Sequence, residues 1–225
     1  KNPLNDTGIT VSGNGTSGIN ASCTKAIQNV GHVPQDCDQG RDADITIANN
    51  KVGTGVASFD YTKLGSDGLA LGIQNVAWST DGTEAEGSKW SCIRDNVTGL
   101  VWEIKTASGI HSFDEKVTWQ NRGGLADATN VEGLCGITLW RVPSLTELLT
   151  IANNGRQNPA NDVPRFPNSK SQSYWTDDAI SGVATNAWAV NFFSGIGNSK
   201  GKTQTYQVRL VAGEYAATRF DGARF

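Results

Sequence analysis

The stretch WSCIRDNVTGLVWEIK, residues 90–105, carries the clearest structural signal in this chain of 225 residues. Two short runs of mainly apolar, β-prone residues, 92–94 and 100–104, flank the polar segment DNVTG. Asp and Asn favour turns, and Gly99 suits a positive φ at the end of one. The pattern predicts a β-hairpin with its turn at residues 95–99.

The stretch WRVPSLTELLTIANN, residues 140–154, predicts a short helix. Pro143 ends the extended segment before it, Ser144 is placed to cap the helix, and Glu147 completes a capping box three residues later. Asn153-Asn154-Gly155 is expected to end the helix. The apolar face of this helix comprises Leu145, Leu148, Leu149 and Ala152.

Elsewhere the signals are mostly those of short strands. VASFDYTKL (56–64) predicts a strand or extended arm, and SYWTDDA (173–179), AWAVNFFSG (187–195) and YQVRLVAG (206–213) predict strands. A weaker helix at 117–129 is interrupted by two glycines. We therefore expect an α+β fold, with a few helices packed on a twisted, mainly antiparallel sheet. The expected divisions are a loop-rich N-terminal lobe (1–89), a core (90–213) and a C-terminal contact tail (214–225).

Composition and motifs argue against several functions. The net charge is −3 and the Lys and Arg residues form no basic run, so we expect no nucleic-acid partner. No apolar run reaches the roughly 18 residues of a membrane span. The chain has no G-x-S-x-G, H-E-x-x-H or P-loop motif, so it is not expected to be an enzyme. An enzyme with an unrecognised site remains the alternative.

Four cysteines allow three disulfide pairings. No C-x-x-C spacing occurs and the chain has only two histidines, which disfavours a zinc site. We expect nearest-neighbour disulfides, Cys23–Cys37 and Cys92–Cys135, with free thiols in a cytosolic protein as the alternative. Because disulfides persist in oxidising compartments, this prediction favours an exported protein at the cell surface or outside the cell.

The order of several motifs resembles a known family. CIRDNVTGLVWEIK, LCGITLWRVPSLTELLTI, YWTDDA, AWAVNFF and YQVRLV follow one another as in the C-terminal domain of bacterial collagen-like adhesins, the Lcl type. QDCDQGRDAD resembles the N-terminal part of longer members, so the likeness spans residues 36–212. The resemblance implies a C-type lectin-like fold, export, and adhesion to a glycan or surface polymer. Some relatives bind sulfated polysaccharides as trimers.

This chain departs from that family in two respects. It lacks a collagen-like Gly-X-Y tract, the device through which collagen-like chains form trimers. It also continues past RLVAG with EYAATRFDGARF, in which Tyr215, Phe220 and Phe225 suggest an assembly contact. An extended tail can add a strand to a neighbour's sheet edge, so the second hypothesis is a structural subunit of a filament or pilus-like assembly. A passive terminus is the alternative.

We expect no cofactor other than calcium, for which carboxylates at two places form candidate sites. Asp36, Asp38 and Asp42 alternate along a Gly-containing segment, as hard-cation ligands often do. There are two alternatives to calcium binding. One of these aspartates forms an ion pair with Arg41, or the Asp side chains stabilise turns. A second candidate set comprises Asp177, Asp178 and Asn191, with a plain turn at a strand end as the alternative.

A sugar site combines aromatic faces with planar polar side chains, and sulfate or carboxylate groups attract cations. A loop, GNSKGKT at 197–203, is expected to supply two lysines. The alternative to ligand binding by the aromatic residues of this region is that they belong to the core, as is expected for Trp175, Trp188 and Phe192. The candidate ligand-binding residues are Tyr174, Trp175, Asp177, Asp178, Lys200, Lys202 and Tyr206.

Overall fold

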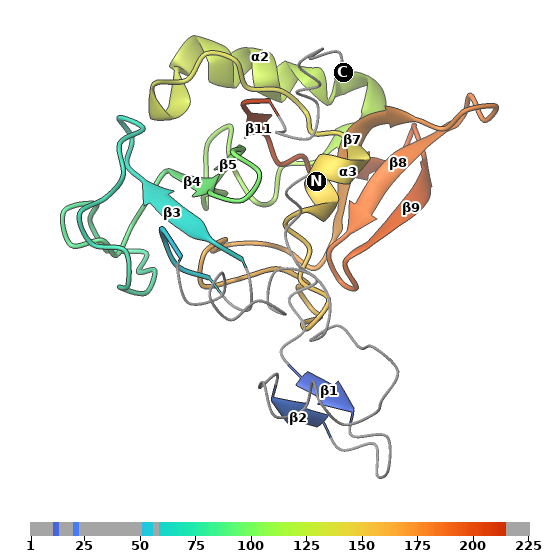
Figure 1. Cartoon of the computed structure of the whole chain (residues 1–225). Helices are drawn as coiled ribbons and strands as arrows, with labels where there is room; N and C mark the ends of the chain where they lie inside the picture. Colours follow the sequence, from blue (N-terminus) through green and yellow to red (C-terminus); the bar gives the residue numbers. More distant parts are fainter. Residues whose placement is uncertain (1–10, 14–19, 23–50, 56–58, 215–225) are drawn as a thin grey trace, which may run out of the picture.

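A computed structural model of the chain describes residues 11–13, 20–22, 51–55 and 59–214 (Figure 1). The predicted hairpin is confirmed: β4 (Cys92–Asp95) and β5 (Val101–Glu103) pair antiparallel, with Ile93 opposite Trp102. Asp95 stabilises the turn because its carboxylate accepts hydrogen bonds from the Val97 amide (2.9 Å) and the Thr98 hydroxyl (2.7 Å). Gly99 adopts the positive φ, 79°, that the turn requires.

The hairpin is the centre of a four-stranded sheet with the order β11-β5-β4-β3. β3 (Tyr61–Leu64) pairs with β4, and β11 (Val211–Ala212) pairs with β5, both antiparallel. Residues 61–64, which fall within the expected N-terminal lobe, therefore contribute to the sheet of the core. Nearer the N-terminus, β1 (Val11–Gly13) and β2 (Asn20–Ser22) form a separate two-stranded antiparallel ladder.

A second sheet contains β7 (Ser173–Ala179), β8 (Asn186–Asn191) and β9 (Ile196–Gly201) in that order, all antiparallel. The expectation of a loop at 197–203 is wrong for most of its length, because residues 196–201 pair with β8 despite their polar sequence. The expected strand at 206–213 is also divided. Its ends belong to β10 (Thr205–Tyr206), which pairs with β6 (Val117–Thr118), and to β11.

The helices are short. α3 (Leu145–Leu149) has the predicted capping box with both hydrogen bonds formed. A 3₁₀ turn, η2 (Trp119–Asn121), precedes α2 (Gly123–Glu132), and η3 (Leu134–Gly136) follows it. The two glycines thus begin α2 and do not interrupt it. Ala126 and Thr129 are buried on one face of the helix, and Gly133 ends it at φ 71°. No helix in the described residues is long and apolar enough to cross a membrane.

Both faces of the four-stranded sheet are buried, so the molecule has two core clusters. One includes Ile93, Trp102 and Leu148, and the other includes Cys92, Val101 and Trp175. The predicted Cys92–Cys135 disulfide forms and joins β4 to η3. Several antiparallel sheets with two helices confirm the α+β class, although the expected single sheet is divided.

Candidate functional site

Three cationic side chains and two aromatic rings gather where β10 pairs with β6, next to the end of β9. Backbone bonds bring these segments together: Tyr206 lies opposite Val117, and the Trp119 amide donates to the Lys202 carbonyl at 3.2 Å. We call this group the cationic–aromatic surface. It comprises Trp119, Arg122, Lys200, Lys202 and Tyr206, each of them half-buried.

Each cation of this surface lies over an aromatic ring. The Lys202 ammonium is 4.3 Å from the centre of the Trp119 ring, and the Arg122 guanidinium carbon is 3.6 Å from the same ring. The Lys200 ammonium is 5.5 Å from the Tyr206 ring centre. Aromatic rings attract cations electrostatically through their quadrupole. The rings therefore hold three positive charges close together. Among the described residues, neither Lys200 nor Lys202 forms an ion pair with a carboxylate.

A buried tryptophan supports the surface from beneath. The Trp175 ring packs edge-to-face against Tyr206, with ring centres 5.0 Å apart, and its indole N–H donates to the Val117 carbonyl at 2.8 Å. The Trp119 indole N–H donates to the Thr176 carbonyl at 3.0 Å. These contacts tie the half-buried Trp119 and Tyr206 rings to β7, so the core sets the positions of the rings over which the cations lie.

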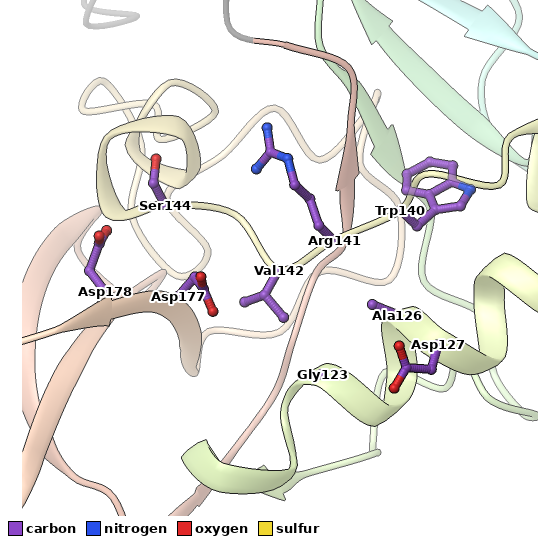
Figure 2. A pocket seen from close by; sticks show the side chains of 9 residues that line it. All are labelled: Gly123, Ala126, Asp127, Trp140, Arg141, Val142, Ser144, Asp177 and Asp178. Atoms are coloured by element: carbon purple, nitrogen blue, oxygen red, sulfur yellow. The ribbon is translucent and has the colours of Figure 1, made fainter.

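A pocket of about 370 Å³ adjoins this surface between α2, β7 and the segment before α3 (Figure 2). Its rim carries three carboxylates, on Asp127, Asp177 and Asp178, and the Arg141 guanidinium, which donates to both Glu147 carboxylate oxygens at 2.7 and 2.6 Å. This rim is acidic and would repel polyanions. The Arg122–Asp177 ion pair, 2.6 Å, marks the boundary between the pocket and the cationic surface.

Of the predicted ligand-binding residues, the cationic–aromatic surface contains Lys200, Lys202 and Tyr206. Asp177 and Asp178 lie on the rim of the adjoining pocket. Tyr174 and Trp175 are 1% and 0% exposed, so the prediction that they present a face to a ligand is wrong. Their side chains alternate across β7 and fill the two core clusters on its opposite faces. Phe192 is likewise buried and Trp188 is half-buried. Asp177 pairs with Arg122, and Asp178 accepts a hydrogen bond from the Leu145 amide.

The second candidate calcium set does not form. Asn191 lies opposite Ser173 in the β7–β8 ladder, five residues along the strand from Asp178, or about 17 Å at the rise of a β-strand. Its side-chain oxygen accepts a hydrogen bond from the Phe193 amide at 2.9 Å. Within residues 59–214 and the shorter described segments, no three His, Cys, Asp or Glu side chains gather as a metal site.

Several predicted residues lie outside the described residues. They are the first calcium set (Asp36, Asp38 and Asp42), the Cys23–Cys37 pair, and the assembly residues Tyr215, Phe220 and Phe225. These expectations stay predictions.

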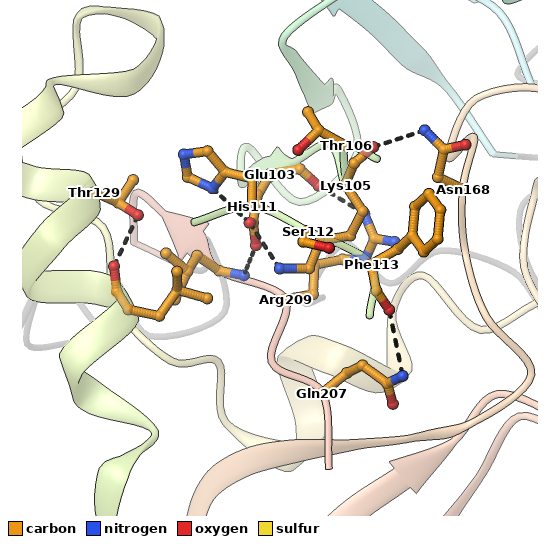
Figure 3. A network of polar contacts seen from close by, with 12 residues as sticks. Glu103, Lys105, Thr106, His111, Ser112, Phe113, Thr129, Asn168, Gln207 and Arg209 are labelled. Atoms are coloured by element: carbon orange, nitrogen blue, oxygen red, sulfur yellow. Dashed lines mark hydrogen bonds and ion pairs between the residues drawn. The ribbon is translucent and has the colours of Figure 1, made fainter. Parts of the chain in front are cut away.

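A second polar cluster is buried near the C-terminal end of α2 (Figure 3). The Glu103 carboxylate accepts hydrogen bonds from Lys105 (2.8 Å), His111 (2.7 Å) and the Leu210 amide (2.8 Å). His111 also contacts Glu132 of α2 through its other ring nitrogen, at 2.9 Å. Arg209 donates to the Glu103 carbonyl at 2.6 Å. The cluster thus joins β5, α2 and the segment before β11.

The charges of this cluster stabilise one another. Burial alone raises the pKa of Glu103, but attraction from Lys105 and the hydrogen bond from His111 outweigh it and hold that pKa below its ordinary value. Burial alone lowers the pKa of His111, but the bonds to Glu103 and Glu132 raise it above its ordinary value. Both ring nitrogens of His111 face carboxylates, so the cluster is suited to structural support.

Trp119 and Arg122 were missed by sequence reasoning. They belong to the segment VTWQNR, which carries only a weak helical signal and lies about 80 residues before the lysines that they meet. The spacing of Trp119 and Arg122, one turn apart, hinted at a ring–cation contact but not at its location.

The sequence that forms this surface matches a known protein family. A family model, the Lcl C-terminal domain, matches residues 91–212, which includes the hairpin, both helices and the cationic–aromatic surface. A search of curated proteins gave no match. Since the family match covers more than half of the chain, this protein belongs to the Lcl C-terminal domain family.

Proposed function

We propose that this domain is an extracellular binding module, not an enzyme, that attaches to a polyanionic surface polymer such as a sulfated glycan. The supporting observation is the gathering of Arg122, Lys200 and Lys202 over two aromatic rings on one surface. Sulfate and carboxylate groups spaced along a polymer match such an array, because several modest charge contacts add up along one chain. Family membership and the Cys92–Cys135 disulfide are compatible with a surface-associated role outside the cell.

The proposal predicts binding to dextran sulfate that depends on the two lysines. Lys200→Glu/Lys202→Glu should weaken binding about tenfold or more at low salt, because it replaces attraction with repulsion at the site, and the difference should shrink in high salt. Isothermal titration against dextran sulfate, with uncharged dextran as the reference ligand, measures this.

A matched control separates the site from net charge. Lys89→Glu/Arg156→Glu changes the net charge equally, but both of its residues are exposed and neither belongs to the cationic–aromatic surface. It should retain most of the affinity. If both double variants lose affinity equally, or if dextran and dextran sulfate bind alike, the proposed function is wrong.

A further inference from the structure

Arg122 is the one cation of the cationic–aromatic surface in which every side-chain nitrogen already donates a hydrogen bond. Its Nε and Nη2 donate to the same Asp177 carboxylate oxygen at 3.1 and 2.6 Å. Its Nη1 donates to the Trp119 carbonyl at 2.7 Å. Among the described residues, the ammonium groups of Lys200 and Lys202 instead lie over aromatic rings and form no ion pair. A ligand anion therefore meets two available cations and one that is already paired.

The geometry of the Arg122–Asp177 pair allows an anion to displace the Asp177 carboxylate. The Asp177 side chain is 62% exposed, whereas that of Arg122 is 17% exposed. Stacking on Trp119 and the bond to its carbonyl hold the guanidinium in place independently of Asp177. Because the Asp177 partner is well exposed to solvent, an incoming anion can approach and replace its carboxylate while the guanidinium stays in place.

We infer that Asp177 is a specificity-determining residue: its carboxylate occupies Arg122, and only a polymer with closely spaced anionic groups displaces it. This inference rests on the proposed function. A sparsely charged polymer brings one anionic group at a time to the surface, and a single group does not outcompete the adjacent Asp177 carboxylate for Arg122. Because Lys202 and Arg122 lie over the same Trp119 ring, that single group would reach Arg122 if the carboxylate were absent. A densely charged polymer places one group at the two lysines and a second at Arg122, and so gains contact with the third cation. Asp177 thereby makes the surface discriminate by anionic charge density.

The test compares Asp177→Asn with Asp127→Asn. Both variants remove one negative charge from the rim of the same pocket, but only Asp177 contacts Arg122. Within residues 59–214, the Asp127 side chain forms no ion pair. The probes are dextran sulfates of low and high substitution at low salt. Asp177→Asn should bind the sparsely sulfated probe about three- to fivefold more tightly, and the densely sulfated one with little change. Asp127→Asn should shift both by less than about 1.5-fold.

A double variant checks that the gain passes through Arg122. Adding Arg122→Gln to Asp177→Asn should abolish the gain for the sparsely sulfated probe. Equal gains from Asp177→Asn and Asp127→Asn, or a gain that persists without Arg122, would overturn the inference while leaving the lysine-dependent binding intact. Loss of all dextran sulfate binding in the unmodified protein would instead refute the proposed function. Thermal unfolding of each variant verifies that it is folded.

Discussion

At the scale of single residues, His111 connects two carboxylates that come from different elements. Glu103 on β5 and Glu132 at the end of α2 each contact one ring nitrogen. Both contacts are hydrogen bonds only when both ring nitrogens carry a proton, so the charged imidazole suits this position. The raised pKa of His111 expresses the same preference.

This raised pKa predicts a stability that declines with pH. An unfolded histidine titrates near pH 6.5, and the folded one titrates higher, so the folded state binds more protons between the two values. The contribution of His111 is full below about pH 6.5 and is lost as the pH rises through the folded pKa. Urea midpoints at pH 6, 7 and 8 should fall with pH by more in the unmodified protein than in His111→Gln. Parallel pH dependences would contradict this.

At the scale of elements, β9 has one edge that no strand pairs with among the described residues. The Lys202 amide donates to the Thr185 carbonyl, which sets the alternation of the β8–β9 ladder. By that alternation Asn198 and Lys200 direct their backbone groups toward β8, and Gly197 and Ser199 direct theirs outward. An outward row of backbone donors and acceptors is a place where a strand from another chain can add.

Amide hydrogen exchange followed by NMR tests this alternation. In dilute protein the amides of Gly197 and Ser199 should exchange faster than those of Asn198 and Lys200, since only the latter pair with β8. If chains assemble into a filament by adding a strand at this edge, the Gly197 and Ser199 amides should become protected as the protein concentration rises. Uniform exchange along residues 197–200 would contradict the predicted pairing of β9.

At the scale of the whole molecule, the Cys92–Cys135 disulfide connects the central sheet to the segment that follows α2. The two cysteines are 43 residues apart, and both are buried in the same core cluster as Trp175. Closing a loop of this length restricts the unfolded chain and stabilises the fold by about 4 kcal/mol. The bridge therefore holds α2 and the Glu132 contact against the sheet.

The double variant Cys92→Ala/Cys135→Ala should lower the free energy of unfolding by about 3–4 kcal/mol, measured by urea denaturation under non-reducing conditions. The unmodified protein serves as the reference at the same pH. A loss below about 1 kcal/mol would mean that the unfolded chain is already compact between these residues, so that the bridge adds little.

Local sequence determined the elements whose signals lie within a few residues. Gly99 and Asp95 specify the β4–β5 turn, and Ser144 with Glu147 specifies the start of α3, because hydrogen bonds between near neighbours stabilise both. The α+β class follows from such elements, and the pairing of Cys92 with Cys135 was expected because they are neighbouring cysteines in the chain. Lys200, Lys202 and Tyr206 were predicted together because they are near one another in the chain.

Tertiary structure alone decided the rest. Trp175 supports the cationic–aromatic surface from the core and does not present a face, since burial depends on which segments cover a strand. The polar segment of β9 became a strand because β8 offered backbone partners, which outweigh weak local propensity. Trp119 and Arg122 reached the lysines through the pairing of β6 with β10, a contact across some 80 residues that no local pattern encodes.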